Sequence, residues 1–148
     1  SGLKMFRLIF LLIVTLLAPL VSSESSPRAM PFTRMYSDGT GVSHFAEGEI
    51  PFGEENAMGA RVSPFTSATS IGYLLLPPGF TQDWSPTPIP QWVIVLAGSG
   101  EIEVQDGEVR EFPMGSILLI EDTKGIGHKT RNIGTEPLII AWIPTRAR

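Results

Sequence analysis

The stretch Gly100-Glu101-Ile102-Glu103-Val104-Gln105-Asp106-Gly107 gives the clearest structural signal in this chain. Its apolar residues, Ile102 and Val104, alternate with polar ones, which is the period of a strand with one face in water. Asp106-Gly107 then favours a type I′ hairpin turn, because both central positions of that turn need a positive φ. The stretch therefore predicts a strand that ends in a tight hairpin.

The sequence on both sides of this hairpin repeats the pattern of short strands between Gly and Pro residues, without a helical period of useful length. Trp92–Leu96 and Ile117–Ile120 are apolar on both faces, which favours burial in a two-layer structure. The sequence predicts an all-β sandwich or barrel in one domain. Its expected strands are Val42–Phe45, Ile71–Leu76, Trp92–Leu96, Glu101–Gln105, Val109–Phe112, Ile117–Ile120, His128–Ile133 and Leu138–Ile143.

Residues 1–23 have the pattern of a secretory signal peptide. Lys4 and Arg7 precede an apolar run from Leu8 to Leu17, and small residues lead to an expected cleavage site after Ser23. The run is shorter than the roughly 20 apolar residues of a transmembrane helix. We therefore expect secretion, with an uncleaved N-terminal anchor as the alternative.

The remaining sequence divides into two parts. Residues 24–35 are rich in serine and proline and are interpreted as a flexible lead-in, and residues 36–148 are interpreted as the folded domain. Residues 1–4 precede a methionine, and we interpret them as a cloning remnant.

Composition narrows the range of partners. The chain has no cysteine, so an exported domain must be stable without disulfides. Without Lys4 and Arg7, 9 of the 11 basic residues remain against 15 acidic ones, a formal charge of −6. Nucleic acid and anionic membranes bind through clustered Lys and Arg, so we expect neither as a partner after signal cleavage.

Gly107, Pro113-Met114-Gly115, His128 and Asn132 together resemble the second conserved motif of the cupin superfamily. Ser43-His44-Phe45 is similar to a segment of a branch of small single-domain cupins. The resemblance covers residues 36–144. It implies a cupin double-stranded β-helix, a jelly-roll barrel of eight or more strands, and we expect a homodimer that pairs through an edge strand.

The first cupin motif falls on Gly79–Gly98. In metal-binding cupins it supplies two histidines and a glutamate, and here those positions hold Ser85, Thr87 and Gln91. Of the four usual ligands only His128 remains. Transition metals prefer imidazole and carboxylate to hydroxyl and amide groups. We therefore expect no metal cofactor, with one divalent transition metal at His128 as the alternative.

The resemblance implies that the His128 side chain points into the barrel. It is a candidate general acid and base, since imidazole titrates near neutrality; the alternative is a histidine that is only hydrogen-bonded in a polar cavity. Asp122 follows a buried strand, so its carboxylate is a candidate to orient His128 or to cap a turn.

The segment Asp83–Trp92 has a proline at every second position. Ser85, Thr87 and Gln91 alternate with these prolines, so we expect the three polar side chains to face the cavity and the prolines to face outward. Such a polar wall would bind a ligand; the alternative is that small polar residues merely replaced the metal ligands.

Five further residues are candidates to line the pocket, with core packing or the surface as the alternative. They are His44, Tyr73, Trp84, Trp92 and Trp142. From the sequence we expect an exported protein that acts on a small organic molecule by acid/base chemistry without a metal, as an isomerase, cyclase or lyase. The alternatives are a non-catalytic binding cupin and a metal-dependent oxygenase-type cupin with atypical ligands.

Overall fold

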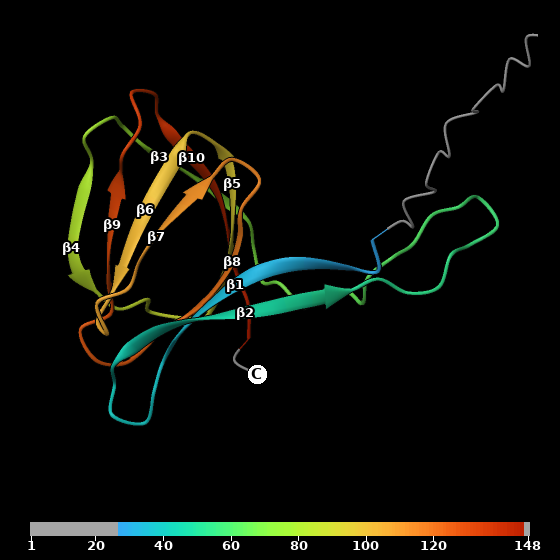
Figure 1. Cartoon of the computed structure of the whole chain (residues 1–148), viewed down its shortest axis with the longest axis horizontal. Coiled ribbons are helices and arrows are strands. Elements are labelled where there is room, and N and C mark those ends of the chain that lie inside the picture. The colour runs from blue at the N-terminus through green and yellow to red at the C-terminus, as the bar shows by residue number, and fades with distance from the viewer. Residues whose placement is uncertain (1–26, 147–148) are drawn as a thin grey trace, which may run out of the picture.

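The computed structural model describes residues 27–146, which form β-strands and no helix (Figure 1). The predicted signal peptide, residues 1–23, and the first residues of the predicted lead-in lie outside this range. The strands are β1 (Ala29–Ser37), β2 (Ser43–Pro51), β3 (Gly72–Leu76), β4 (Thr81–Ser85), β5 (Gln91–Ala97), β6 (Ser99–Val104), β7 (Val109–Pro113), β8 (Ile117–Glu121), β9 (His128–Asn132) and β10 (Leu138–Pro144).

The strands form two facing sheets, as predicted. One sheet has the order β2-β1-β8-β5-β10-β3 and the other the order β4-β9-β6-β7. From β3 to β10 the chain crosses to the opposite sheet at every connection except the β6–β7 hairpin. This alternation defines an eight-stranded double-sheet jelly roll. The prediction of an all-β jelly-roll barrel is confirmed.

The core lies between the sheets and is made from the inward side chains of both. Alternation places Val93 and Val95 of β5 on the same inner face as Leu118 of β8. Phe45 and Phe112 meet across the layers with ring centroids 5.8 Å apart. These apolar side chains do not fill the interior completely, and Val93, Val95, Leu118 and Phe112 also line a cavity between the sheets.

The prediction of a flexible lead-in over residues 24–35 is wrong from Ala29 onward. β1 pairs with β2 along its whole length and runs parallel to β8 from Thr33 to Tyr36. Met35 is fully buried and Phe32 is 8% exposed. Phe32 and Met35 are three residues apart, so they do not show the two-residue period that is typical of a strand. Pro31, within the same segment, is more typical of a loop. The strand forms because it covers the edge of β8.

The predicted turn at Asp106-Gly107 also differs from the structure. Gly107 has φ +96°, but no residue other than glycine has a positive φ in the described range. The loop contains Gln105 as a third residue, because Val104 N–H donates to Glu108 O. This geometry fits a type I turn followed by a left-handed glycine, the usual three-residue hairpin.

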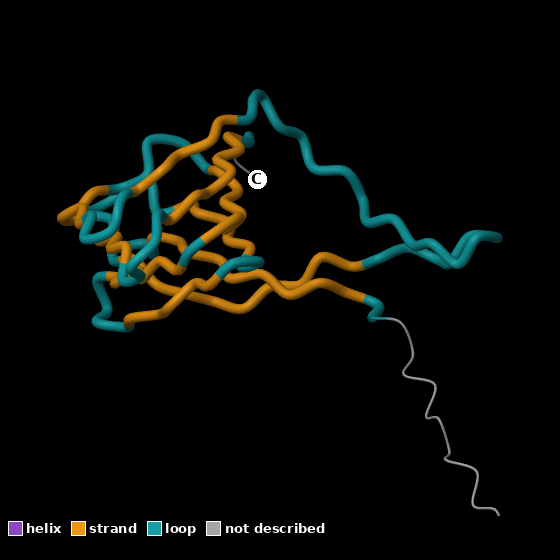
Figure 2. Tube along the Cα trace, turned by 90° about the horizontal axis from the view of Figure 1, so that it is seen from above, coloured by secondary structure: helices purple, strands orange, loops and turns teal. Residues whose placement is uncertain are grey.

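The β1–β2 hairpin extends past the barrel, and the chain returns from β2 to β3 without regular structure (Figure 2). β2 is accordingly longer than the strand predicted over Val42–Phe45. In the described residues there is no helix with the length and apolar character that a membrane span needs. The outer strands of the two sheets are β2, β3, β4 and β7, and dimerisation through one of them stays a prediction.

Candidate functional site

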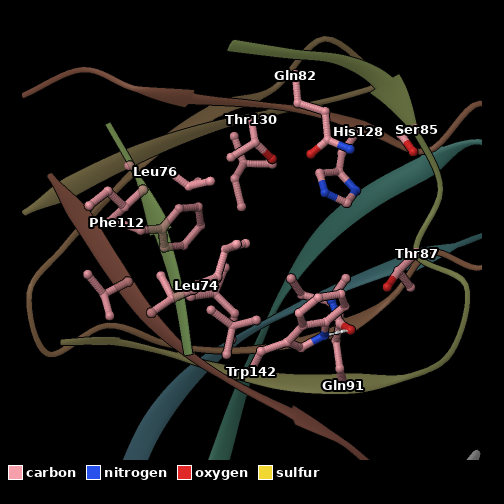
Figure 3. A pocket seen from close by; sticks show the side chains of 18 of the residues that line it. Leu74, Leu76, Gln82, Ser85, Thr87, Gln91, Phe112, His128, Thr130 and Trp142 are labelled. Atoms are coloured by element: carbon pink, nitrogen blue, oxygen red, sulfur yellow. Dashed lines mark hydrogen bonds between the residues drawn. The ribbon is translucent and has the colours of Figure 1, made fainter. Parts of the chain in front are cut away.

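A cavity of about 540 Å³ opens between the two sheets (Figure 3). Leucine, valine, isoleucine and phenylalanine side chains line most of it, among them Leu74 and Leu76 of β3 and Phe112 of β7. The polar side chains gather on the other side of the cavity in Figure 3. The polar residues of the lining are Thr81, Gln82, Ser85, Thr87, Gln91, His128 and Thr130. The site is therefore an apolar chamber with one polar wall.

His128 opens β9, where it pairs with Ser85 of β4 and Val104 of β6. Its Nδ1 lies 2.6 Å from Oδ2 of Asp122, whose side chain is fully buried just after β8. A carboxylate only accepts hydrogen bonds, so Nδ1 carries the proton and Nε2 is left to the cavity. The predicted contact between these two residues is present.

Gly127 sets the position of His128. With φ +78° it is in the left-handed region, and a Cβ on it would overlap the carbonyl group of Ser85. The loop before β9 therefore approaches the end of β4 more closely than any other residue would allow. Ser43 holds the same loop, since its Oγ donates to Gly127 O at 2.7 Å.

Ser85, Thr87 and Gln91 all line the cavity, as predicted. Gln91 is 8% exposed, and its Oε1 accepts a hydrogen bond from Trp142 Nε1, so Trp142 also lines the cavity as predicted. Thr87 is 3% exposed, and its N–H donates to Asp122 O at 3.2 Å. The polar wall is thus connected through the backbone to the acid that holds His128.

The prediction that the intervening prolines all face outward is wrong. Pro86 and Pro88 line the cavity together with Thr87. Residues 86–90 form the connection between β4 and β5 rather than a strand. Side chains in such a turn do not alternate between two faces, so neighbouring residues can reach the same cavity.

His44 does not line the cavity, which corrects the prediction. Its Nε2 lies 2.8 Å from Asp38 Oδ2 and its Nδ1 lies 2.7 Å from Asp106 Oδ2. Both hydrogen bonds raise the pKa of His44, and the bond to Asp38 has the larger effect. The hydrogen bond from His44 lowers the pKa of Asp38. The pKa of Asp106 is also lowered, mainly by the hydrogen bond that it accepts from the Glu108 N–H and to a smaller extent by the one from His44. His44 faces outward because the neighbouring Ser43 and Phe45, both buried, take the inner face.

Tyr73, Trp84 and Trp92 are also outside the cavity, contrary to prediction. Tyr73 is 71% exposed because its strand neighbours Leu74 and Leu76 set the inner face. Trp92 follows the inward Gln91, so alternation turns it outward. It packs there edge to face on Phe32, with centroids 5.0 Å apart.

Trp84 is displaced by an irregularity in β4. The register of β4 against β9 shifts between Gln82 and Ser85, and both of these residues face the cavity. A bulge of this kind changes which residues point inward. Trp84 therefore lies on the outside, where Lys129 Nζ is 4.8 Å from its ring centroid.

Thr81, Gln82 and Thr130 also line the cavity, although none of them was predicted. Thr130 is two residues after His128 on β9, so strand alternation alone indicates that it shares the inner face. For Gln82 no such signal exists, because the bulge in β4 cannot be read from the sequence.

The donor set of the cavity does not fit a transition metal. At the positions of the usual ligands the cavity offers two hydroxyls, one amide and a single imidazole, His128. Within residues 27–146 there is no group of three or more His, Cys, Asp or Glu side chains placed to hold a metal ion. Imidazole and carboxylate are the ligands that bind such ions firmly. That the protein uses no metal stays a prediction.

The strand order of the two sheets defines an all-β double-stranded β-helix, the jelly-roll architecture. No family model matches the chain, and no curated protein matches it either.

Solved structures with a similar arrangement include cupin-domain proteins of low sequence identity. The Cupin_2 domain of an XRE family transcriptional regulator from Enterobacter cloacae is 22% identical, has a TM-score of 0.44, and the match covers 53% of this chain and 81% of that one. An uncharacterised protein with a double-stranded β-helix domain from Klebsiella pneumoniae is 21% identical, with a TM-score of 0.44 and coverage of 65% and 74%. A Cupin 2 conserved barrel domain protein from Salinispora arenicola is 18% identical, with a TM-score of 0.44 and coverage of 57% and 71%. These likenesses concern the fold alone.

Proposed function

We propose that this protein binds a small organic molecule in the barrel cavity and moves a proton on it without a metal ion, as an isomerase, cyclase or lyase. The observation that carries the proposal is the 2.6 Å hydrogen bond between His128 Nδ1 and the buried carboxylate of Asp122. This bond fixes the imidazole so that Nε2 faces the ligand, and it stabilises the imidazolium that forms when Nε2 takes a proton.

The burial of Asp122 supports this role. A carboxylate without contact to water costs free energy unless its oxygens have hydrogen-bond donors. Asp122 Oδ2 has His128, but Oδ1 has no donor among the described residues. Stability alone would favour an apolar side chain at this position, and such a cost is common where a residue serves a reaction.

Deuterium exchange tests the proposal on any compound that the cavity binds. Small carbonyl compounds that raise the melting temperature of the protein would be incubated with it in D₂O containing a chelator, and proton NMR would follow the loss of C–H signals. We expect exchange that His128→Gln abolishes and that Ser99→Ala, outside the cavity, leaves unchanged. Compounds that bind without any exchange, or equal exchange in His128→Gln, would refute acid/base chemistry at His128.

A non-catalytic binding protein is the second candidate. The observation that favours it is the largely apolar lining, in which His128 is the one ionisable side chain among the described residues. Tight binding of a ligand that stays chemically unchanged would favour a non-catalytic binding protein over an enzyme.

Export belongs to the same proposal and rests on residues 1–23 of the sequence. N-terminal sequencing of protein secreted by an expression host should start at Glu24. Recovery of the uncleaved chain from the membrane fraction would favour the anchored alternative.

A further inference from the structure

We infer that the substrate is an uncharged, largely apolar carbonyl compound with a C–H bond next to its carbonyl, and that the Gln91 amide holds the carbonyl oxygen. The inference rests on the proposed function, since it names the substrate class of the same cavity. It is carried by the charge of the cavity wall and by the fixed directions of two polar groups, Gln91 and His128.

The cavity wall argues against a charged ligand. Among the described residues that line it there is no Lys, Arg, Asp or Glu, and His128 already faces the carboxylate of Asp122. A carboxylate, phosphate or ammonium group would lose its hydration in such a chamber, which is unfavourable when no opposite charge receives it. The volume of about 540 Å³ lies in the usual range for sites that enclose small molecules.

Trp142 fixes the direction of the Gln91 amide. An indole N–H can only donate, so the atom that faces it must be the amide oxygen, Oε1. The amide nitrogen of Gln91 then points away from Trp142 and keeps its N–H donors for the cavity. Because Gln91 is only 8% exposed, these donors gain most from a ligand that accepts a hydrogen bond.

His128 offers the complementary group. Its Nδ1 is engaged by Asp122, so Nε2 presents a lone pair to the same polar side of the cavity as Gln91 (Figure 3). A donor and a base together suit a carbonyl compound. Nε2 takes the proton from the adjacent carbon, the C–H electron pair moves to form the C=C bond of an enolate, and the oxygen becomes negative at the Gln91 N–H.

The reaction closes without another reactant. The imidazolium of His128 returns its proton to the same carbon or to another carbon of the conjugated system, which restores the carbonyl and leaves an exchanged or isomerised product. Asp122 stays a carboxylate throughout and stabilises the imidazolium. The apolar wall opposite, which includes Leu74 and Phe112, packs on the hydrocarbon part of the substrate.

Equilibrium binding of two matched probes tests the inference. 2-Acetylnaphthalene is an uncharged ketone, and 2-naphthoate has the same ring with a carboxylate. We expect the ketone to bind at least about 10-fold more tightly in titrations of tryptophan fluorescence, because the carboxylate loses its hydration. Gln91→Glu keeps the acceptor for Trp142 but loses the amide donor, and should weaken ketone binding about 10-fold.

Gln82→Glu is the matched control, since it adds the same charge at an exposed residue that lines the cavity and should change ketone binding less than Gln91→Glu. If melting curves show that Gln91→Glu is unfolded, Gln91→Met replaces it with the same expected loss. Equal or tighter binding of 2-naphthoate, no ketone binding, or equal effects of the two glutamate variants would overturn the inference. Ketone binding that needs Gln91 but gives no deuterium exchange would instead refute the proposed function and leave the recognition intact.

Discussion

Removing His128 should destabilise the protein more than its size suggests, because it leaves Asp122 buried without a donor. The Asp122 side chain is 0% exposed, and His128 Nδ1 is its one side-chain donor among the described residues. Breaking a buried pair by removing one partner costs about 3–5 kcal/mol. We expect His128→Leu, which keeps an apolar body of similar size, to lower the free energy of unfolding by this amount.

The companion variants separate pairing from packing. Asp122→Asn removes the charge and should cost about 1–3 kcal/mol, since one buried amide group stays without a partner. The double variant should cost less than the sum of the two single variants by about 2 kcal/mol, because its His128→Leu change no longer strands a charge. Urea denaturation followed by tryptophan fluorescence measures all four proteins. Additive costs would show that the two side chains do not interact as the structure has them.

Three further predictions address other parts of the fold. Gly127→Ala should cost about 2–4 kcal/mol in thermal unfolding, because a Cβ there would overlap the Ser85 backbone, whereas Gly107→Ala, which has open space, should cost only about 1–2 kcal/mol for its positive φ. Equal losses would refute the close approach. Met35→Ala should cost about 2–5 kcal/mol by urea denaturation, while Met114→Ala, 69% exposed, should be near neutral; a neutral Met35→Ala would mean that β1 does not pack. Because the pKa of His44 is raised, protonated His44 contributes fully to the free energy of unfolding below its ordinary pKa of 6.5, and this contribution is lost as the pH rises through the raised pKa. Urea titrations should therefore show the wild type losing stability over that pH range, whereas His44→Gln should not. The same pH profile for both proteins would contradict the pairing with Asp38 and Asp106.

The sequence allows most of the barrel to be predicted, because strand alternation and turn residues are local signals. Gly100–Gly107 forms a strand and hairpin turn as expected, although the turn type differs because Asp106 has no positive φ. The strand β1 could not be recognised in the same way. Its formation depends on the uncovered edge of β8, a long-range contact that no local pattern encodes.

The site could be predicted where the cupin resemblance or strand alternation indicated an inward side chain. His128, expected from the resemblance, Gln91, expected from alternation, and the candidate Trp142 all line the cavity. The aromatic predictions failed where two neighbours on one strand were both assigned to the pocket, as with Gln91 and Trp92, which alternation forbids. The outward position of Trp84 follows from a bulge, and bulges depend on the partner strand.

The central claim is that His128 presents a free Nε2 to a ligand in the barrel. Nitrogen NMR of protein labelled in histidine tests it directly, because the chain has only two histidines and His44→Gln assigns them. At a pH where His128 is neutral we predict that its proton is on Nδ1, and that 2-acetylnaphthalene shifts its Nε2 resonance while those of His44 stay unchanged. A proton on Nε2, or a His128 signal that does not respond to the bound ketone, would contradict the account.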